Sequence, residues 1–294
     1  MNKSILAALT RAAQVVLFTF FLNIPIFLFS QNIENEEIEE VSSPTPALDD
    51  FTTGRHIIAE KQALRHAPVR EADVMWEKRL WRIIDTREKL NLPFTAPESP
   101  LFDILAQAIE DGQLRAYSTE SDKFDRALTP NDVKNVLHKT DTVMIVNVDT
   151  GEEEVRAVSS DLNSEDVKRF KIKEVWWFDK NTGTLRQRIL GIAPMIEVRD
   201  EEGNFRFERP LFWVHYPTAR QVLAHHQAIV SDNVSAALTW EDVFEQRHFA
   251  SYITKESNVQ DRRLQDYLTG VDLLMEGQRI EDHLFNMEHD LWSW

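Results

Sequence analysis

The chain has 294 residues, of which 43% are hydrophobic, including 17 Phe and 8 Trp, and this supply of core residues argues against wholesale disorder. Its formal net charge of −16 argues against general binding of nucleic acid, whose phosphates require a basic surface. The chain contains no cysteine, which excludes disulfides, thiol catalysis and a lipid-modified N-terminal cysteine.

Residues 1–30 have the pattern of a secretory signal peptide. Lys3 and Arg11 supply the positive charge, and residues 15–29 form an apolar run interrupted by Asn and Pro. Because a membrane span needs roughly 20 apolar residues, this run predicts a signal that is cleaved after Ser30, with no membrane insertion of the exported chain. An uncleaved anchor is the alternative interpretation.

Residues 31–55 are predicted to form a flexible acidic arm, since the part up to Asp50 holds seven acids and no base. The remaining residues, 56–294, are predicted to form a single domain of the α+β class. We expect a mixed, mainly antiparallel sheet with hairpins, flanking helices and a helical C-terminal region.

Two N-terminal helices are predicted within residues 68–112. Side chains that recur every three or four residues predict the first helix over residues 68–90, namely Trp76, Leu80, Ile83, Ile84, Arg87 and Leu90. Ser99 and Pro100 predict the start of the second helix, with Ser as its cap, and Gly112 predicts its end.

A Leu–polar–x–x–Asp–Val pattern occurs three times, beginning at Leu128, Leu162 and Leu238. In the first and third copies a Thr precedes the Asp by three residues, a capping-box variant that predicts the start of a helix.

The first two copies are each followed by two β-rich runs with Thr-Gly between them, at Thr150-Gly151 and Thr182-Gly183. This spacing predicts two related helix-plus-hairpin units that share one sheet. Recurrent capping without duplication explains the pattern as well.

The sheet is predicted to continue through residues 205–216, and a helix is predicted to begin at Pro217 and to extend to His226. C-terminal helices are predicted over residues 239–294. The first of them covers residues 243–253, and two apolar stripes follow, one of Leu264, Tyr267, Leu268, Val271, Leu274 and Met275 and one of Ile280, Leu284, Met287 and Leu291.

No catalytic, metal or cofactor motif is present in the sequence. There is no phosphate-binding glycine loop, and the adjacent His225 and His226 would point about 100° apart on a helix and could not share an ion. Paired carboxylates of a glycosidase type are not marked out among the 49 acids. We therefore expect a non-enzymatic protein without a cofactor.

Aromatic residues indicate protein contacts, because large rigid side chains bury area at low entropic cost. Trp176 and Trp177 are adjacent in a predicted strand and so point to opposite faces of the sheet, each of which must be covered. Either helices of this chain or a partner would cover them. The interface hypothesis comprises Trp177, Arg186, Arg188, Trp292 and Trp294.

Several ordered segments carry a resemblance to a known family. They include residues 81–91 (WRIIDTREKLN), the strand 176–179 (WWFD), residues 191–194 (GIAP), residues 209–214 (RPLFWV) and residues 288–292 (EHDLW). In this order, over most of the chain from residue 76 onward, they resemble the GldN family, called PorN in non-gliding relatives.

The resemblance implies a non-catalytic periplasmic subunit of the type IX secretion and gliding machinery, associated with the outer membrane. Members of the family assemble with the outer-membrane lipoprotein GldK or PorK into a ring and contact the periplasmic portion of the motor protein GldM or PorM. An envelope glycan-binding module, with the paired tryptophans as a stacking platform, and a carboxylate-dependent peptidoglycan enzyme are the alternative functions.

Overall fold

The computed structural model describes residues 58, 60–146, 153–200, 204–229 and 238–292. It divides into Met1–Thr53, outside the described part, and Gly54–Trp294, which holds every described element. The predicted signal peptide and the predicted arm lie outside the described residues, so both stay predictions. No helix in the described ranges combines the length and the apolar character needed to cross a bilayer.

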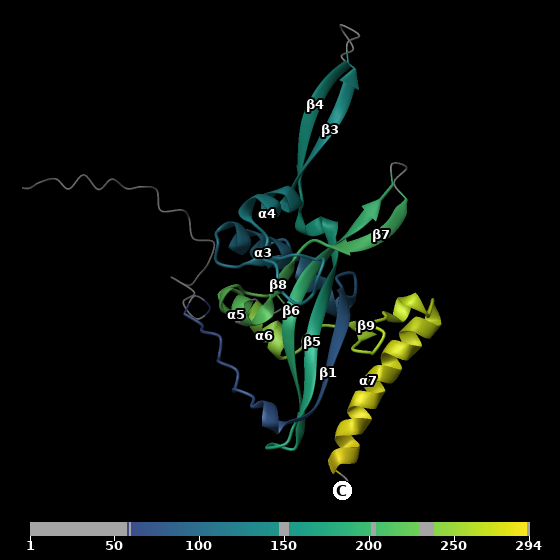
Figure 1. Ribbon diagram of the computed structural model, residues 1–294. Helices are drawn as coiled ribbons and strands as arrows, with labels where there is room; N and C mark the ends of the chain where they lie inside the picture. Colours follow the sequence, from purple (N-terminus) through teal and green to yellow (C-terminus); the bar gives the residue numbers. More distant parts are fainter. Residues whose placement is uncertain (1–57, 59, 147–152, 201–203, 230–237, 293–294) are drawn as a thin grey trace, which may run out of the picture. The chain divides into compact units, whose positions relative to one another are not determined.

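A seven-stranded antiparallel sheet lies at the centre of Gly54–Trp294 (Figure 1). Its strands run in the order β2, β8, β6, β5, β1 and β9, and β7 pairs with another part of β6. Together with the helices, this sheet confirms the predicted α+β class. The strands are β1 (Val74–Asp85), β2 (Ala116–Tyr117), β5 (Val167–Asp179), β6 (Thr184–Arg199), β7 (Phe205–Pro210), β8 (Trp213–His215) and β9 (Tyr252–Glu256).

The helices occupy the connections between strands and the C-terminal end. The α-helices are α3 (Leu101–Glu110), α4 (Pro130–Leu137), α5 (Tyr216–Ala224), α6 (Trp240–Glu245) and α7 (Val271–Trp292). Short 3-10 turns are η1 (Glu71–Asp73), η2 (Lys89–Thr95), η3 (Ser164–Asp166) and η4 (Leu264–Asp266). The predicted second helix and the helix after Pro217 are thus confirmed as α3 and α5. The expected cap of α3 is wrong, because the Ser99 hydroxyl donates instead to the carbonyl of Gln227 at 2.8 Å.

The predicted helix over residues 68–90 is wrong, because most of this segment is β1. Strand β1 pairs with β5 on one side and β9 on the other. Both of its faces are covered in its second half, so Leu80 and Trp81 are both buried although they point to opposite faces. A strand buried on both faces lacks alternation of apolar and polar residues, and the apolar residues of β1, which Arg82 interrupts, also fit a helical spacing.

The hairpin of β5 and β6 is confirmed, with the predicted turn between them. Gly183 has a φ of +64° and donates its backbone N–H to the carbonyl of Asp179 at 2.8 Å. The other predicted hairpin forms as β3 (His138–Val146) and β4 (Glu153–Asp161), but it is a separate two-stranded sheet. The prediction that both hairpins share one sheet is therefore wrong, and Thr150-Gly151 lies outside the described residues.

Capping boxes are confirmed at Thr129 and Thr239, whose side chains accept the backbone N–H groups of Asp132 and Asp242. The prediction that the sheet continues through residues 205–216 is confirmed, and this segment contains two strands, β7 and β8.

The C-terminal region contains a strand as well as helices, so the helix predicted over residues 243–253 is wrong. Helix α6 ends at Glu245, and β9 begins at Tyr252 and pairs with β1. The aromatic and β-branched residues of β9 suit a strand better than a helix. The first predicted stripe does not form one helical face, because Leu264 is buried in η4 whereas Val271, Leu274 and Met275 are exposed on α7. Ile280 and Leu284 of the second stripe are buried on α7.

The two faces of the sheet carry different cores. Even-numbered side chains of β1 and β5, such as Ile84, Phe170 and Ile172, join the main core with α3, α5 and α6. A second cluster on this face contains Leu80 and the inner side chains of α7. The odd-numbered side chains face the other way, where Trp81 packs with Trp213 and Ala193. This second face forms the floor of the site described below.

Helix α7 docks through charge as well as through apolar contact. Glu174 of β5 is fully buried, and Arg247 Nη1 donates to its Oε1 at 2.8 Å. Arg82 of β1 lies between Glu174 and Glu281 of α7 and forms ion pairs with both. Gly277 lets the helix approach closely, because a Cβ there would lie 3.0 Å from the carbonyl oxygen of Ile253.

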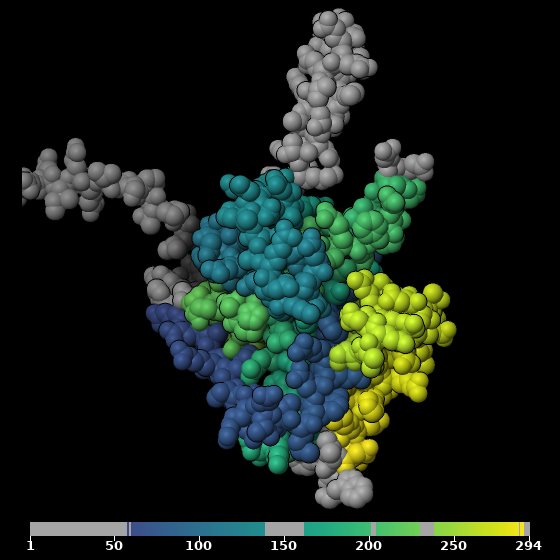
Figure 2. Space-filling model, viewed as in Figure 1, coloured from purple at the N-terminus to yellow at the C-terminus, as the bar shows by residue number. Residues whose placement is uncertain are grey.

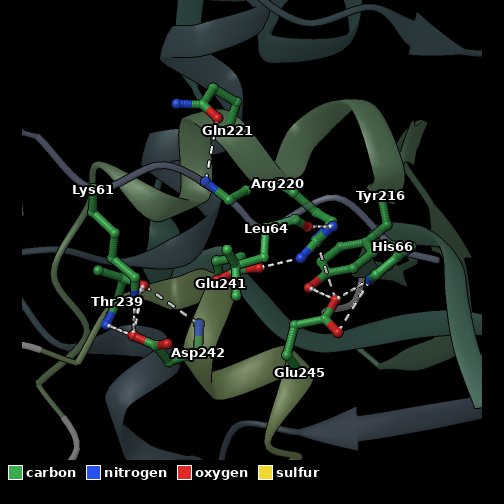
Figure 3. A network of polar contacts seen from close by, with 11 residues as sticks. Lys61, Leu64, His66, Tyr216, Arg220, Gln221, Thr239, Glu241, Asp242 and Glu245 are labelled. Atoms are coloured by element: carbon green, nitrogen blue, oxygen red, sulfur yellow. Dashed lines mark hydrogen bonds and ion pairs between the residues drawn. The ribbon is translucent and has the colours of Figure 1, made fainter.

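An N-terminal strap, residues 60–70, runs along α5 and α6 (Figure 3). Lys61 forms an ion pair with Asp242 at the start of α6. Arg220 of α5 donates to the carbonyl of Leu64 at 2.6 Å, and His66 lies 3.2 Å from Glu245. The strap is therefore attached to the helices that cover the main core.

Candidate functional site, a basic groove

A groove of about 1050 Å³ lies over the second face of the sheet. Its floor consists of Trp81 of β1, Lys171 and Lys173 of β5 and Met195 of β6. Strand β7 and the two segments 119–123 and 254–265 supply the walls. Because side chains alternate along a strand, the neighbours of these residues point into the main core while their own side chains point toward the groove.

Basic residues dominate the groove although the whole chain carries a net charge of −16. Nine basic and four acidic residues line it, an excess of five positive charges. Each of the four acids, Glu120, Asp122, Glu208 and Asp261, already pairs with a base.

Five of the lining bases have no ion pair with any residue in the described ranges. They are Lys123, Lys171, Arg206, Arg209 and Arg263. All but Lys171 are exposed to solvent. Among the described residues, the groove thus presents positive charge that lacks an ion pair, and this potential favours a negatively charged ligand.

Lys171 is half-buried at the centre of the floor, with its Nζ 6.0 Å from the ring centre of Trp213. Burial, followed by the positive charge of Arg263, lowers the pKa of Lys171 to about 8. Burial also lowers the pKa of Lys173, whose Nζ donates to the backbone carbonyl of Asp122 at 2.6 Å. A carboxylate beside Lys171 would supply the counter-charge that this side chain lacks.

Aromatic rings give the groove an apolar component. Trp81 lies under two lysines, with Lys255 Nζ 4.4 Å and Lys173 Nζ 5.6 Å from its ring centre. Its indole N–H donates to Asp122 at 2.8 Å, which attaches the segment 119–123 to the sheet. Phe205 and Phe207 of β7 remain 57% and 49% exposed, so a ligand that covers them would bury apolar area as well as charge.

The wall on the side of β2 depends on a close approach at Gly191. Phe124, in the left-handed region with φ +58°, packs edge-on against Trp213 with ring centres 6.0 Å apart. A Cβ at residue 191 would lie 2.4 Å from the Phe124 ring, so only glycine accommodates this ring. Within the described ranges, no three His, Asp or Glu side chains are gathered in a way that could hold a metal ion.

Three of the predicted interface residues, Trp177, Arg186 and Arg188, do not line this groove. Trp177 is only 6% exposed, and the Arg188 guanidinium lies 5.3 Å from its ring centre. Arg188 also donates to the carbonyl of Ala67 in the strap at 3.2 Å. Arg186 is exposed and pairs with Asp179.

Trp292 is a residue of α7 whose side chain lies outside the described part, as does the whole of Trp294. Trp176 and Trp177 do not form a paired platform for a sugar, because they point to opposite faces and Trp177 is covered within the chain.

Sequence reasoning missed the groove. Its bases come from separate strands and loops, and Lys171 and Lys173 alone were visible as an alternating pattern in β5. The net acidity of the chain concealed a local basic surface, since a sum over all residues contains no information on position.

Comparison with known families gives a match over most of the chain. Residues 69–293 match the family model described as "Gliding motility associated protein GldN". A search among curated proteins found no match.

Proposed function

Because the chain belongs to the GldN family of gliding motility associated proteins, we propose that it acts as a non-catalytic structural subunit of the type IX secretion and gliding machinery. Family membership makes it a component of that machinery. In the proposal it lies in the periplasm, assembles with an outer-membrane lipoprotein of the GldK or PorK type into a ring, and contacts the periplasmic part of the motor protein GldM or PorM.

The observation that carries the proposal is the extent of the family match. It covers residues 69–293, which include β1, the whole central sheet and α7. The likeness therefore concerns every described strand and the α-helices α3 to α7.

An uncovered apolar helix face supports a role in assembly. Helix α7 exposes Val271, Leu274, Met275 and Phe285, which are 55–73% exposed and share one face at helical spacing. Figure 2 shows α7, in yellow, on the outside of the molecule. Contiguous exposed apolar side chains are typical of surfaces that contact other proteins.

Co-expression of the chain with its outer-membrane lipoprotein, followed by pull-down and size-exclusion chromatography, tests the proposal. We expect a stable complex of high mass. The double variant Leu274→Glu and Met275→Glu should remain folded and weaken this complex at least tenfold, because it places charge on the apolar face.

Asp272→Lys with Glu276→Lys serves as the matched control, since it changes two charges on the same helix without altering the apolar face. A folded chain that stays monomeric and fails to capture the lipoprotein would contradict the proposed function.

A further inference from the structure

We propose that the basic groove receives the acidic segment Ile33–Val41 of a second copy of this chain. The inference deepens the proposed ring assembly and rests on it. It names the surfaces through which successive copies would meet, and its first test needs no partner protein.

The chemistry of the segment matches the chemistry of the groove. Residues 33–41 read IENEEIEEV, with five glutamates, three aliphatic side chains and no base. The groove has an excess of five positive charges and five bases that lack an ion pair within the described ranges. Binding of the segment would therefore neutralise the groove almost completely.

The apolar residues of the segment also find partners. Phe205 and Phe207 leave about half of their surface exposed at one wall of the groove. In an extended segment Ile33 and Val41 lie on one face and Ile38 on the other, with glutamates on both, so either face can offer carboxylates to the bases and an aliphatic group to a ring. A free phosphate or a purely acidic polymer would use the charges alone.

The proposed ring favours a second copy as the source of the segment, because successive copies in a ring meet through unlike surfaces. The strap is attached to α5 and α6 through Lys61, Leu64 and His66. These helices cover the face of the sheet that carries Ile84 and Ile172, whereas the groove lies on the face that carries Trp81 and Lys171. The part of the strap that carries Lys61, Leu64 and His66 is thus attached on the face opposite to the groove.

Such a contact is heterologous, because a segment of one copy meets a groove of the next. Repeated contacts of this type produce a closed ring when the rotation between copies closes and an open filament when it does not. The acidic segment and the basic groove are complementary surfaces of this kind.

The first experiment measures binding of a fluorescent peptide of residues 31–42 to a chain that begins at residue 43. We expect binding that weakens as salt rises, since screening reduces exposed charge contacts. The groove variant Lys171→Glu, Arg206→Glu and Arg209→Glu should bind the peptide at least tenfold more weakly. The control variant Arg65→Glu, Arg115→Glu and Lys180→Glu reverses three exposed bases outside the groove and should bind within twofold of the parent.

The second experiment mixes two defective chains and measures their association by sedimentation velocity. One begins at residue 43 and keeps its groove, and the other begins at Gln31, keeps the segment and carries the groove variant. We expect each chain alone to be monomeric and the mixture to form a one-to-one complex. Circular dichroism and thermal melting establish that both chains are folded.

The remaining outcomes overturn the proposal. Peptide binding that is unaffected by the groove variant, or no peptide binding at all, removes the groove as the site. Peptide binding without association of the mixed chains shows that the segment docks on its own chain. In each case capture of the lipoprotein by the parent chain is measured separately. A positive capture supports the proposed function even when the groove does not bind the segment.

Discussion

A single glycine determines the wall of the basic groove. Gly191 lies where the Phe124 ring packs onto the sheet, and a methyl group there would lie 2.4 Å from the ring. Phe124 in turn contacts Trp213, and the indole of Trp81 bonds to Asp122 two residues before it. Backbone space at one position therefore controls the placement of several side chains in the groove.

Gly191→Ala is expected to lower the free energy of unfolding by about 1–3 kcal/mol, because the added methyl group overpacks the Phe124 site. Urea denaturation measures the change. In the background of Phe124→Ala, where the ring is absent, the same substitution should cost less than about 0.5 kcal/mol. Equal costs in both backgrounds would show that the ring is not the cause.

Lys171 provides a pH-dependent test of the groove. Its pKa of about 8 lies below the roughly 10.4 of an unfolded lysine, so its charge disfavours folding below pH 8, and this cost disappears as the pH rises through about 10.4. Lys171→Met should therefore raise the free energy of unfolding by about 1–3 kcal/mol near pH 7, and the gain should vanish above about pH 10.4.

Denaturation series at several pH values, with the exposed Lys180→Met as control, measure this difference. A gain that is independent of pH would contradict the assigned cause.

At the scale of elements, α7 separates buried from exposed side chains at adjacent positions. Leu284 is 2% exposed in the cluster with Leu80, whereas Phe285 is 73% exposed. Leu284→Ala should lower the free energy of unfolding by about 2–4 kcal/mol, because it leaves a cavity between helix and sheet. Phe285→Ala should change it by less than about 0.5 kcal/mol in a thermal or chemical melt of the isolated chain.

These two neighbours serve as controls for each other. A large loss of stability from Phe285→Ala would show that the outer face of α7 contributes to the fold, and would remove it as a surface available to a partner.

The elements were predictable from sequence where a local signal determines them. The turn at Gly183 and the cap boxes at Thr129 and Thr239 depend on a few adjacent residues, and all three are confirmed. Strand β1 was not predictable in this way. Its buried Arg82 interrupts the apolar run, and only Glu174 and Glu281, far along the chain, make that burial acceptable.

The groove was less predictable than the fold for the same reason. Lys171, Arg209 and Arg263 lie on three segments that only the tertiary structure brings together. A candidate site built from distant residues requires the sheet order, and no local pattern in this sequence specifies that order.

At the scale of the whole molecule, the strap attaches residues 60–70 to α5 and α6. Glu245 is central to this attachment, since it accepts the Tyr216 hydroxyl at 3.0 Å and pairs with His66 and Arg220. The strap buries little apolar surface of its own, and Leu64 is 82% exposed. Its attachment is therefore mainly polar.

Glu245→Gln should release the strap while the sheet stays folded. We expect trypsin to cleave after the exposed Arg65 roughly tenfold faster, which corresponds to a loss of about 1.4 kcal/mol in the local opening equilibrium. Glu276→Gln, on α7, is the control. An unchanged cleavage rate would show that other contacts hold the strap.

The ion pairs under α7 determine where along its axis the helix can dock. An interface of leucines and isoleucines tolerates sliding, because one aliphatic side chain replaces another after a shift of one turn, about 5.4 Å. Here such a shift would bring Gln278 or Phe285 opposite Arg82 in place of Glu281 and would leave the buried guanidinium with Glu174 as its remaining carboxylate partner. The ion pairs thus exclude docking of α7 shifted by one turn along its axis. They therefore fix where the exposed face of α7 lies on the surface.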